Sequence, residues 1–259
     1  MIAGREIEVA SYTFFTGLAA LSVIAIGAAI ASRRGLSAGR TAVCLLAGSV
    51  FTLVAGRFIH RLTHPGSFDS RHTLFIMSTE NLSIYAGLIV GVPVTLFAAR
   101  LLRVNGWQLA DSVTPALALA AVFAKIGCFM TGCCYGKPTS VPWAIPTAIG
   151  SNAHGYQLIS GAIGLFNRPL PIHPAQIYEA VAALAAGLVA VWGLHNRLPK
   201  GSAFLLFMAI FSTTRLINWF FTAPSTNFIA PLWVFPALYA VTAAVCSLLI
   251  ARQRKPATR

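Results

Sequence analysis

The sequence predicts an all-α, polytopic membrane protein with about seven transmembrane helices. Hydrophobic residues make up 57% of its 259 residues and charged residues only 10%, and the mean hydropathy is +0.74. Apolar runs of about 20 residues, the length that crosses the hydrocarbon core of a bilayer, recur along the chain. Because the first run is long and no basic leader region precedes it, we expect no cleavable signal peptide. The expected spans are residues 9–32, 41–60, 81–101, 109–130, 175–196, 202–222 and 231–251.

The whole chain, 1–259, is predicted to form a single helical domain with one irregular segment. Residues 131–174, between the fourth and fifth expected spans, are rich in glycine and proline and lack helical periodicity. Aromatic residues such as Trp143, Tyr156 and Phe166 are interleaved in this segment, which argues against disorder. A loop of this length in a compact fold is usually functional. We therefore expect a cap that covers the outer face of the bundle or re-enters the membrane.

Lysine and arginine are distributed unequally between the two sets of loops. Cytoplasmic loops carry the excess of these residues, which predicts an N-terminus outside and a C-terminus in the cytoplasm. The net charge of +13 is spread over short loops and the tail, which favours contact with anionic lipid headgroups and excludes a nucleic-acid-binding domain. The expected cytoplasmic set is Arg33, Arg34, Arg40, Arg100, Arg103, Arg197, Lys200, Arg252, Arg254, Lys255 and Arg259.

Several ionisable or phenolic residues lie inside the expected spans, where a bilayer tolerates charge only if it is paired, faces the bundle interior or is used. One interpretation is that Glu179 pairs with a cation to stabilise packing, while Arg57 and Tyr12 reach the interface. The other is a site for an outer-leaflet phospholipid phosphate, because the cations outnumber the carboxylate. We favour the second. With the N-terminus outside, all members fall in the outer half of the membrane: Tyr12, Arg57, Tyr85, Lys125, Glu179 and Arg215.

A glycine-rich string ends the fourth span. In the segment 125–136, Lys125-Ile-Gly-Cys-Phe-Met-Thr-Gly-Cys-Cys-Tyr-Gly136, three glycines would let the backbone approach a ligand closely. Their N–H groups could face an anion. The three are Gly127, Gly132 and Gly136.

A second string, His173-Pro-Ala-Gln-Ile-Tyr-Glu179, opens the fifth span. It places Gln176 and Glu179 three residues apart, on one helix face. Its His-Pro pair also fits an ordinary helix start with proline in the first turn.

The chain resembles the prolipoprotein diacylglyceryl transferase family, seven-span enzymes of the bacterial cytoplasmic membrane. The resemblance rests on the two strings above, on Gly56-Arg57, on Ser83-Ile-Tyr-Ala-Gly-Leu-Ile89 and on Arg215-Leu-Ile-Asn-Trp-Phe-Phe221. It implies transfer of the diacylglyceryl group of phosphatidylglycerol to the lipobox cysteine thiol of a preprolipoprotein, forming a thioether and releasing glycerol phosphate. It implies no metal and no organic cofactor.

The reaction that the resemblance implies needs a phosphate clamp, stabilisation of the leaving charge and a base for the thiol. We expect Lys125 and Arg215 to hold the phosphate, Glu179 to orient them or relay a proton, and Tyr85 to act at the transferred ester. The expected substrate-binding residues are Tyr12, Arg57, Gly127, Gly132, Gly136, His173, Gln176 and Asn218.

Four positions depart from the best-known members of the family. Tyr85 stands in place of a histidine, Lys125 of an arginine, Cys128 of an asparagine and Trp219 of a glutamate. These changes leave two other functions open. One is a diverged paralogue with a different lipid acceptor, and the other is a non-catalytic lipid-binding or transport protein.

The five cysteines form two groups. Cys44 and Cys246 lie in apolar spans and are expected to be small core residues. Cys128, Cys133 and Cys134 cluster near the oxidising side, in a spacing unlike that of common zinc or haem sites. We expect these three to pack closely around the glycines. A disulfide from Cys128 to one of the others, or a thiol acting directly in group transfer, stays open.

Overall fold

The computed structural model describes residues 2–63, 84–196, 198–224 and 233–254, with all their side chains except those of residues 2–10, 63, 84–86 and 254. This part of the chain contains eight helices. They are α1 (Ile2–Arg33), α2 (Ala38–Thr63), α3 (Ile84–Leu101), α4 (Gly106–Met130), α5 (Asn152–Ile159), α6 (Ala175–His195), α7 (Ser202–Trp219) and α8 (Val234–Arg254).

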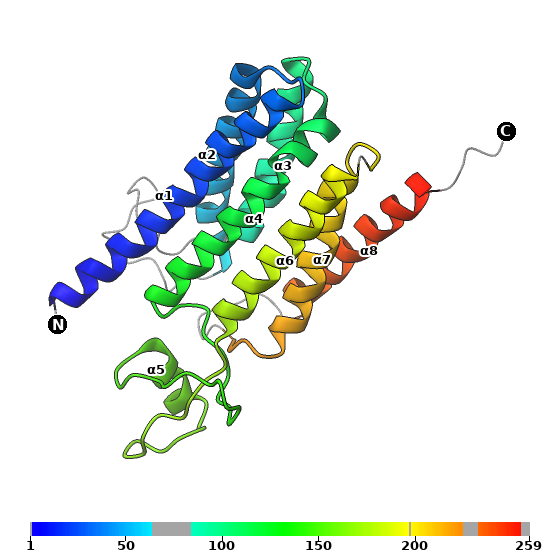
Figure 1. Ribbon diagram of the computed structural model, residues 1–259. Coiled ribbons are helices and arrows are strands. Elements are labelled where there is room, and N and C mark those ends of the chain that lie inside the picture. The colour runs from blue at the N-terminus through cyan, green and yellow to red at the C-terminus, as the bar shows by residue number, and fades with distance from the viewer. Residues whose placement is uncertain (1, 64–83, 197, 225–232, 255–259) are drawn as a thin grey trace.

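All helices except α5 run side by side in one bundle (Figure 1). The central helix is α4, which packs against α1 and α6. Beyond α1 lie α2 and α3, packed against each other, and beyond α6 lie α7 and then α8. Within the described residues, six helices are long and apolar enough to cross a membrane, and Gly87–Leu101 of α3 is a shorter apolar helix. The prediction of an all-helical, multi-pass membrane protein is confirmed.

Each expected span corresponds to one long helix, although the bounds differ. The first helix begins at Ile2, seven residues before the expected start at residue 9, and α2 extends three residues beyond its expected span at both ends. The sixth span was predicted to reach residue 222, but α7 ends at Trp219, with Phe220 as its C-cap. Residues 81–83 and 231–232 of the expected spans lie outside the described residues.

Reciprocal glycine–threonine contacts bring α2 and α3 close together. A Cβ added to Gly48 would lie 1.8 Å from Thr95 Oγ1, and one added to Gly91 would lie 1.7 Å from Thr52 Oγ1. Each threonine hydroxyl donates within its own helix, to the carbonyl four residues earlier, so neither hydroxyl is left without an acceptor at the contact. Small residues at these positions allow the backbones to approach, the usual basis of helix packing in a bilayer.

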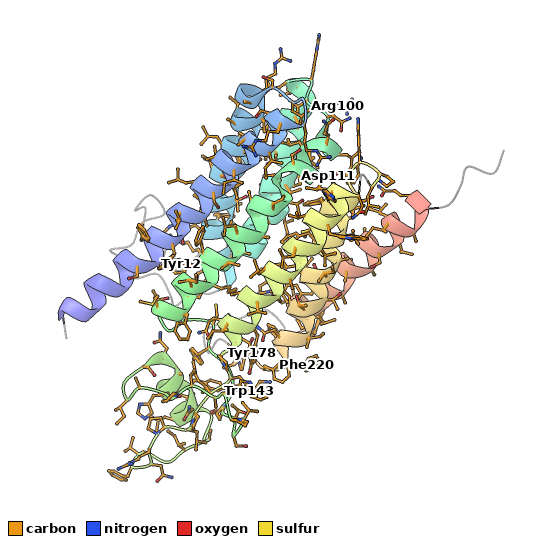
Figure 2. The ribbon with its side chains drawn as sticks, viewed as in Figure 1. Tyr12, Arg100, Asp111, Trp143, Tyr178 and Phe220 are labelled. Carbon is orange, nitrogen blue, oxygen red and sulfur yellow. The ribbon has the colours of Figure 1, made fainter. Side chains whose placement is uncertain are left out.

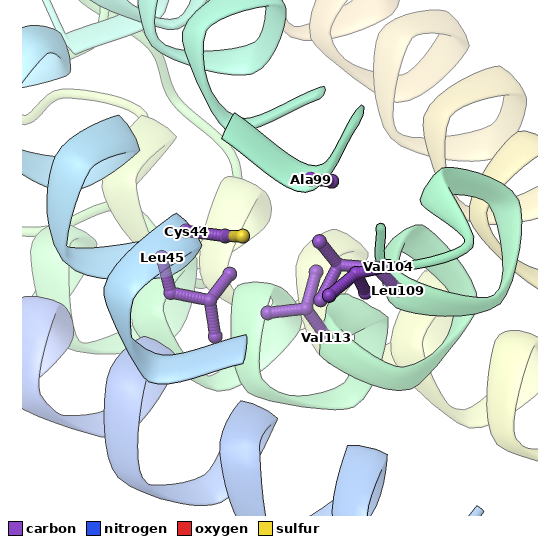
Figure 3. Packing of buried hydrophobic residues seen from close by; sticks show 6 residues of the cluster. All are labelled: Cys44, Leu45, Ala99, Val104, Leu109 and Val113. Atoms are coloured by element: carbon purple, nitrogen blue, oxygen red, sulfur yellow. The ribbon is translucent and has the colours of Figure 1, made fainter. Parts of the chain in front are cut away.

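Two apolar clusters hold α4 in the centre. One joins α4 to α2 and α3 and includes the fully buried Cys44, which confirms its expected role as a core residue (Figure 3). The other joins α4 to α6 and α7 through small side chains and Phe207. The first comprises Cys44, Leu45, Ala99, Val104, Leu109 and Val113, and the second Ala118, Ala186, Ala190, Ala203 and Phe207.

The buried face of α6 changes character along its length. From Ala183 onward it consists of alanine and glycine, and a Cβ on Gly187 would lie 2.4 Å from the Ala118 methyl group of α4. In the first turns the same face carries Gln176 and Glu179, both buried. The close packing of the small residues therefore places two polar side chains against α4 and α7.

The end of the bundle opposite the cap is fastened by Asp111 of α4 (Figure 2). Its carboxylate accepts hydrogen bonds from the backbone amides of Gly201, at 2.7 Å, and Phe204, at 3.1 Å. These amides begin α7, where free N–H groups and the helix dipole favour an anion. The same end carries basic residues, among them Arg34 and Lys200 between helices and Arg100 in the last turn of α3.

The cap, residues 131–174, lies beyond the ends of α4 and α6 (Figure 1). It contains one helix, α5, that the sequence patterns did not predict. Gln157 of α5 is fully buried and fastens the cap internally, because its amide exchanges two 2.8 Å hydrogen bonds with the backbone of Leu170. The cap is therefore ordered by a buried polar side chain as well as by its aromatic residues.

Candidate active site

Charged side chains from three helices meet at Glu179. Lys125 of α4 and Arg215 of α7 both form salt bridges with Glu179 Oε2, and Lys125 Nζ lies 2.5 Å from it. Glu179 Oε1 accepts a 2.8 Å hydrogen bond from Asn218 Nδ2. Four of the expected site residues thus form one network, which includes both ionic partners considered for Glu179.

Tyr239 of α8 completes this network, and the sequence reasoning missed it. Its hydroxyl accepts a hydrogen bond from Arg215 Nη2 at 2.5 Å, and the guanidinium carbon lies 5.0 Å from the ring centroid. The side chain is almost completely buried. The sequence did offer a signal for this residue, because Tyr239 is the single tyrosine of the last expected span and a buried phenol needs a hydrogen-bond partner.

The network carries one net positive charge, since two cations share one carboxylate. Only 13% of the Lys125 side chain and 18% of the Arg215 side chain are exposed, against 8% for Glu179. In surroundings of low dielectric constant such a charge attracts an anion more strongly than it would in water. The arrangement is therefore suited to a phosphate or another anion at this depth.

A groove of about 280 Å³ between α4 and α6 passes Lys125. Apart from Lys125 and Gln176, its lining is apolar. Several lining side chains are exposed on the outside of the bundle, which is where a bilayer would contact them. The groove therefore offers an apolar chain a path from the lipid to the ion pair. Its lining comprises Val122, Lys125, Ile126, Phe129, Gln176, Ile177, Ala180, Val181 and Leu184.

Two amide oxygens beside the network have no hydrogen-bond partner among the described residues. Gln176 donates through Nε2 to Cys133 O at 2.7 Å, and Asn218 donates to Glu179 and to Ala175 O. The carbonyl oxygens of both side chains are buried and unsatisfied. Buried acceptors of this kind require explanation, and a hydroxyl-bearing ligand would supply the missing donors.

The cysteines near the end of α4 form a compact group beside the network. The sulfur atoms of Cys128, Cys133 and Cys134 all lie within 4.8 Å of one another. Interactions with Cys128 and Cys133, together with the nearby charges of Lys125 and Arg215, hold the pKa of the Cys134 thiol well below its usual value. All three are free thiols in the structure.

The three glycines of the string 125–136 have structural uses that need no ligand. A Cβ on Gly127 would press on Phe15 of α1 at 3.1 Å, and Gly132 has a positive φ of 66° in the turn after α4. A Cβ on Gly136 would lie 2.2 Å from His173 O. Their expected role in substrate binding stays a prediction.

His173 lies at the junction between the cap and the bundle and not in the network at Glu179. Its Nδ1 is 3.2 Å from the Tyr178 hydroxyl, which accepts a 2.7 Å hydrogen bond from Trp143 Nε1 (Figure 2). The ring packs edge-on against Phe221. Burial lowers the pKa of His173, which favours the neutral imidazole.

The remaining expected site residues have different positions. Tyr12 of α1 lies near the three cysteines and against Gly127. Arg57 is buried in α2, which packs against α1 and α3, and the described residues show no salt bridge between it and Glu179.

Tyr85 is in the first turn of α3, but its side chain lies outside the described part of the structure. Trp219, which stands in place of the glutamate named in the sequence analysis, packs against Phe235 of α8.

The fold and the site define a multi-pass membrane protein with a buried, net-positive network beside a lateral apolar groove. Comparison with known proteins makes this class more specific. The chain belongs to the prolipoprotein diacylglyceryl transferase family, whose profile matches residues 1–252.

Among its relatives is phosphatidylglycerol–prolipoprotein diacylglyceryl transferase 2 of Clostridium perfringens, which is 26% identical over 212 residues, 81% of this chain and 77% of the relative. A protein of Paenarthrobacter aurescens with the same enzyme name is 27% identical over 262 residues, 94% of this chain and 80% of the relative. The corresponding protein of Mannheimia succiniciproducens is 30% identical over 155 residues, 60% of this chain and 52% of the relative.

Proposed function

We propose that this chain transfers the diacylglyceryl group of phosphatidylglycerol to the lipobox cysteine thiol of a preprolipoprotein. The observation that carries the proposal is the net-positive network at Glu179 beside an apolar groove between α4 and α6. Membership of the family and the names of the relatives support the same reaction.

In this proposal Lys125 and Arg215 bind the lipid phosphate and stabilise the charge that develops on it as the ester bond breaks. Charge-assisted hydrogen bonds from these cations would be stronger here than in water, because the network is largely buried. Glu179 already accepts from Lys125, Arg215 and Asn218, so its role is to hold the two cations in position.

The groove and the unsatisfied amides would bind the rest of the lipid. An acyl chain lying along the apolar lining would place its polar end at Lys125. The free oxygens of Gln176 and Asn218 would accept hydrogen bonds from the hydroxyl groups of the glycerol headgroup. Tyr85, at the start of α3, stays our candidate for a group near the transferred ester.

The proposed location is the bacterial cytoplasmic membrane, with the cap and the network on its outer side. The excess of basic loop residues at the end opposite the cap supports this orientation. A preprolipoprotein would then approach from the cap side, and phosphatidylglycerol would enter laterally from the outer leaflet.

The proposal is tested by complementation of a bacterial strain depleted of its own diacylglyceryl transferase. The readout is the mass of a reporter lipoprotein, which should increase by one diacylglyceryl group when the wild-type chain is expressed. The matched variants are Arg215→Ala, which should fail, and Arg168→Ala on the exposed surface of the cap, which should succeed. An unmodified reporter in cells that contain folded wild-type protein would contradict the proposal and favour a different acceptor.

A further inference from the structure

Three cysteine thiols, whose spacing in the sequence is unlike that of common zinc or haem sites, lie close together in the structure. Cys128 lies in the last turn of α4, which ends at Met130, and the chain then reverses so that Cys133 N donates to Cys128 O at 3.1 Å. Gly132 and Cys134 both have positive φ angles, 66° and 54°, and a non-glycine residue adopts such a conformation rarely. This turn places all three sulfurs within 4.8 Å of one another.

Side chains of α6 and of the turn after α4 form hydrogen bonds with the cysteine group. Gln176 of α6 donates to Cys133 O at 2.7 Å, and the Thr131 hydroxyl lies 3.5 Å from Cys133 Sγ, within donor distance of the sulfur. Partners of this kind orient ligands and stabilise thiolates around metal ions. Cys128 is buried, while Cys134 is exposed and leaves the group accessible.

Three mutually close sulfurs fit a metal ion better than a disulfide. A disulfide joins two sulfurs at about 2.04 Å, so one of the three thiols would remain unpaired. A zinc ion about 2.3 Å from each thiolate would hold the sulfurs roughly 3.8 Å apart in a tetrahedral site, within the observed limit of 4.8 Å. We infer that Cys128, Cys133 and Cys134 bind one zinc ion as three thiolates and leave its fourth position open.

The charges of the neighbouring site favour this arrangement. Three thiolates and one zinc ion carry one net negative charge, and Lys125 and Arg215 act on the cysteine group from the adjacent network. Sites with three protein ligands and one open position are the catalytic type of zinc site.

The open position suggests a role that rests on the function proposed above. Glu179 already accepts from three donors, two of them cations, so it is poorly placed to take a proton from the acceptor thiol. An acceptor thiol that binds zinc releases its proton to water and keeps its electron pair as a thiolate. Attack on the glycerol carbon then forms the S–C bond and breaks the bond from that carbon to the phosphate oxygen, which retains the electron pair.

The metal site is tested first without reference to activity. Full-length protein in detergent should contain about one zinc per chain by elemental analysis, and Co²⁺ in its place should give sulfur-to-cobalt charge-transfer absorption. The variant Cys128→Ser/Cys133→Ser/Cys134→Ser should lose the zinc and the absorption. Cys134→Ser, at the exposed member, should lower zinc retention with least disturbance of the fold.

The matched control is Cys44→Ala/Cys246→Ala, which removes the two core thiols and should keep about one zinc per chain. Wild-type protein that neither contains zinc nor takes up Zn²⁺ or Co²⁺ would overturn the inference. An intact mass two hydrogens lower, showing a disulfide in the group, would overturn it as well.

Lipid transfer to a lipobox peptide separates this inference from the proposed function. If both hold, removal of zinc with a chelator should lower turnover about 100-fold, and added Zn²⁺ should restore it. Undiminished turnover in zinc-free protein would overturn the catalytic role of the zinc and leave the proposed function intact. Zinc binding in a chain that transfers no lipid would refute the proposed function and retain the metal site.

Discussion

Glu179 explains how several charges can lie together inside a membrane helix bundle. Its two carboxylate oxygens accept from Lys125, Arg215 and Asn218, so the buried anion is fully paired. Two cations share this one carboxylate, so the network keeps one net positive charge. A structural ion pair would need only one of them, because desolvation makes every additional buried charge costly.

Arg215→Ala should leave Lys125 and Glu179 as a neutral pair with no surplus charge for a phosphate. We expect transfer activity to fall by at least about 100-fold, since the loss of a donor to developing charge costs roughly 2.7–4 kcal/mol. Lys125→Arg keeps the charge and should retain activity within about tenfold. Both are measured as lipid transfer in detergent, with melting temperature recorded alongside. Full activity in Arg215→Ala would refute the phosphate assignment, and loss of folding in its place would favour a structural ion pair.

Tyr239→Phe should remove the hydroxyl that accepts from Arg215 and retain the aromatic ring next to the guanidinium. Hydrogen bonds to charged groups are worth about 1.5–3 kcal/mol, and we expect a loss of this size in the free energy of unfolding. If Tyr239 also orients Arg215, the KM for phosphatidylglycerol should rise. Tyr156→Phe in the cap is the control and should change neither quantity. Unchanged stability and KM in Tyr239→Phe would show that the Tyr239 hydroxyl does not position Arg215.

At the scale of elements, the site depends on three segments that meet at one backbone junction. The turn after α4 pairs with the end of α7, because Lys137 N donates to Phe221 O and Ala223 N donates to Tyr135 O. It also pairs with the start of α6, because His173 N donates to Lys137 O. The helices that carry Lys125, Glu179 and Arg215 are therefore connected at the cap end as well as through their small-residue faces.

Gly136→Ala tests this junction. The added methyl would lie 2.2 Å from the carbonyl oxygen of His173, so the backbone must shift. We expect a loss of about 1–3 kcal/mol in the free energy of unfolding, together with reduced activity, measured by thermal unfolding and lipid transfer in detergent. Gly155→Ala is the control, because its added methyl would meet nothing within 4 Å, and it should be neutral or slightly stabilising. Equal behaviour of the two variants would contradict the importance of the junction.

At the scale of the whole molecule, the two ends of the bundle differ in chemistry. One end carries the cap, the cysteine group and the network at Glu179. The other carries short basic loops and is fastened by Asp111 at the start of α7. A bilayer with more anionic lipid on its cytoplasmic face favours an orientation with the basic end inside.

Reporter fusions test the orientation. An enzyme that is active only outside the cytoplasmic membrane should be active when fused after Gly161 in the cap and inactive when fused after Gly35, between α1 and α2. The reason is that only the first position is predicted to lie on the outer side. A cytoplasmic fluorescent reporter should show the opposite pattern. Activity of the outside reporter after Gly35 alone would reverse the proposed topology and exclude an outer-leaflet lipid as the substrate.

The sequence by itself determined the membrane class and the number of long helices, and it predicted the depth of the polar residues. These properties follow from local composition, because a bilayer requires an apolar run of fixed length and makes each buried charge conspicuous. Depth was enough to predict that Lys125, Glu179 and Arg215 lie in the same layer. Depth does not show which side chains of that layer touch one another. Arg57, for example, lies on α2, which packs against α1 and α3.

Only the tertiary structure decided the contacts within that layer. Tyr239 meets Arg215 because α8 packs on α7, and three thiols in an unfamiliar spacing converge because the backbone reverses through Gly132 and Cys134. Neither contact leaves a periodic signal in the sequence, since both depend on helix neighbours and turn geometry. Those neighbours are selected by small-residue faces such as Ala186 and Gly187, whose close fit is a property of two helices together and not of either one.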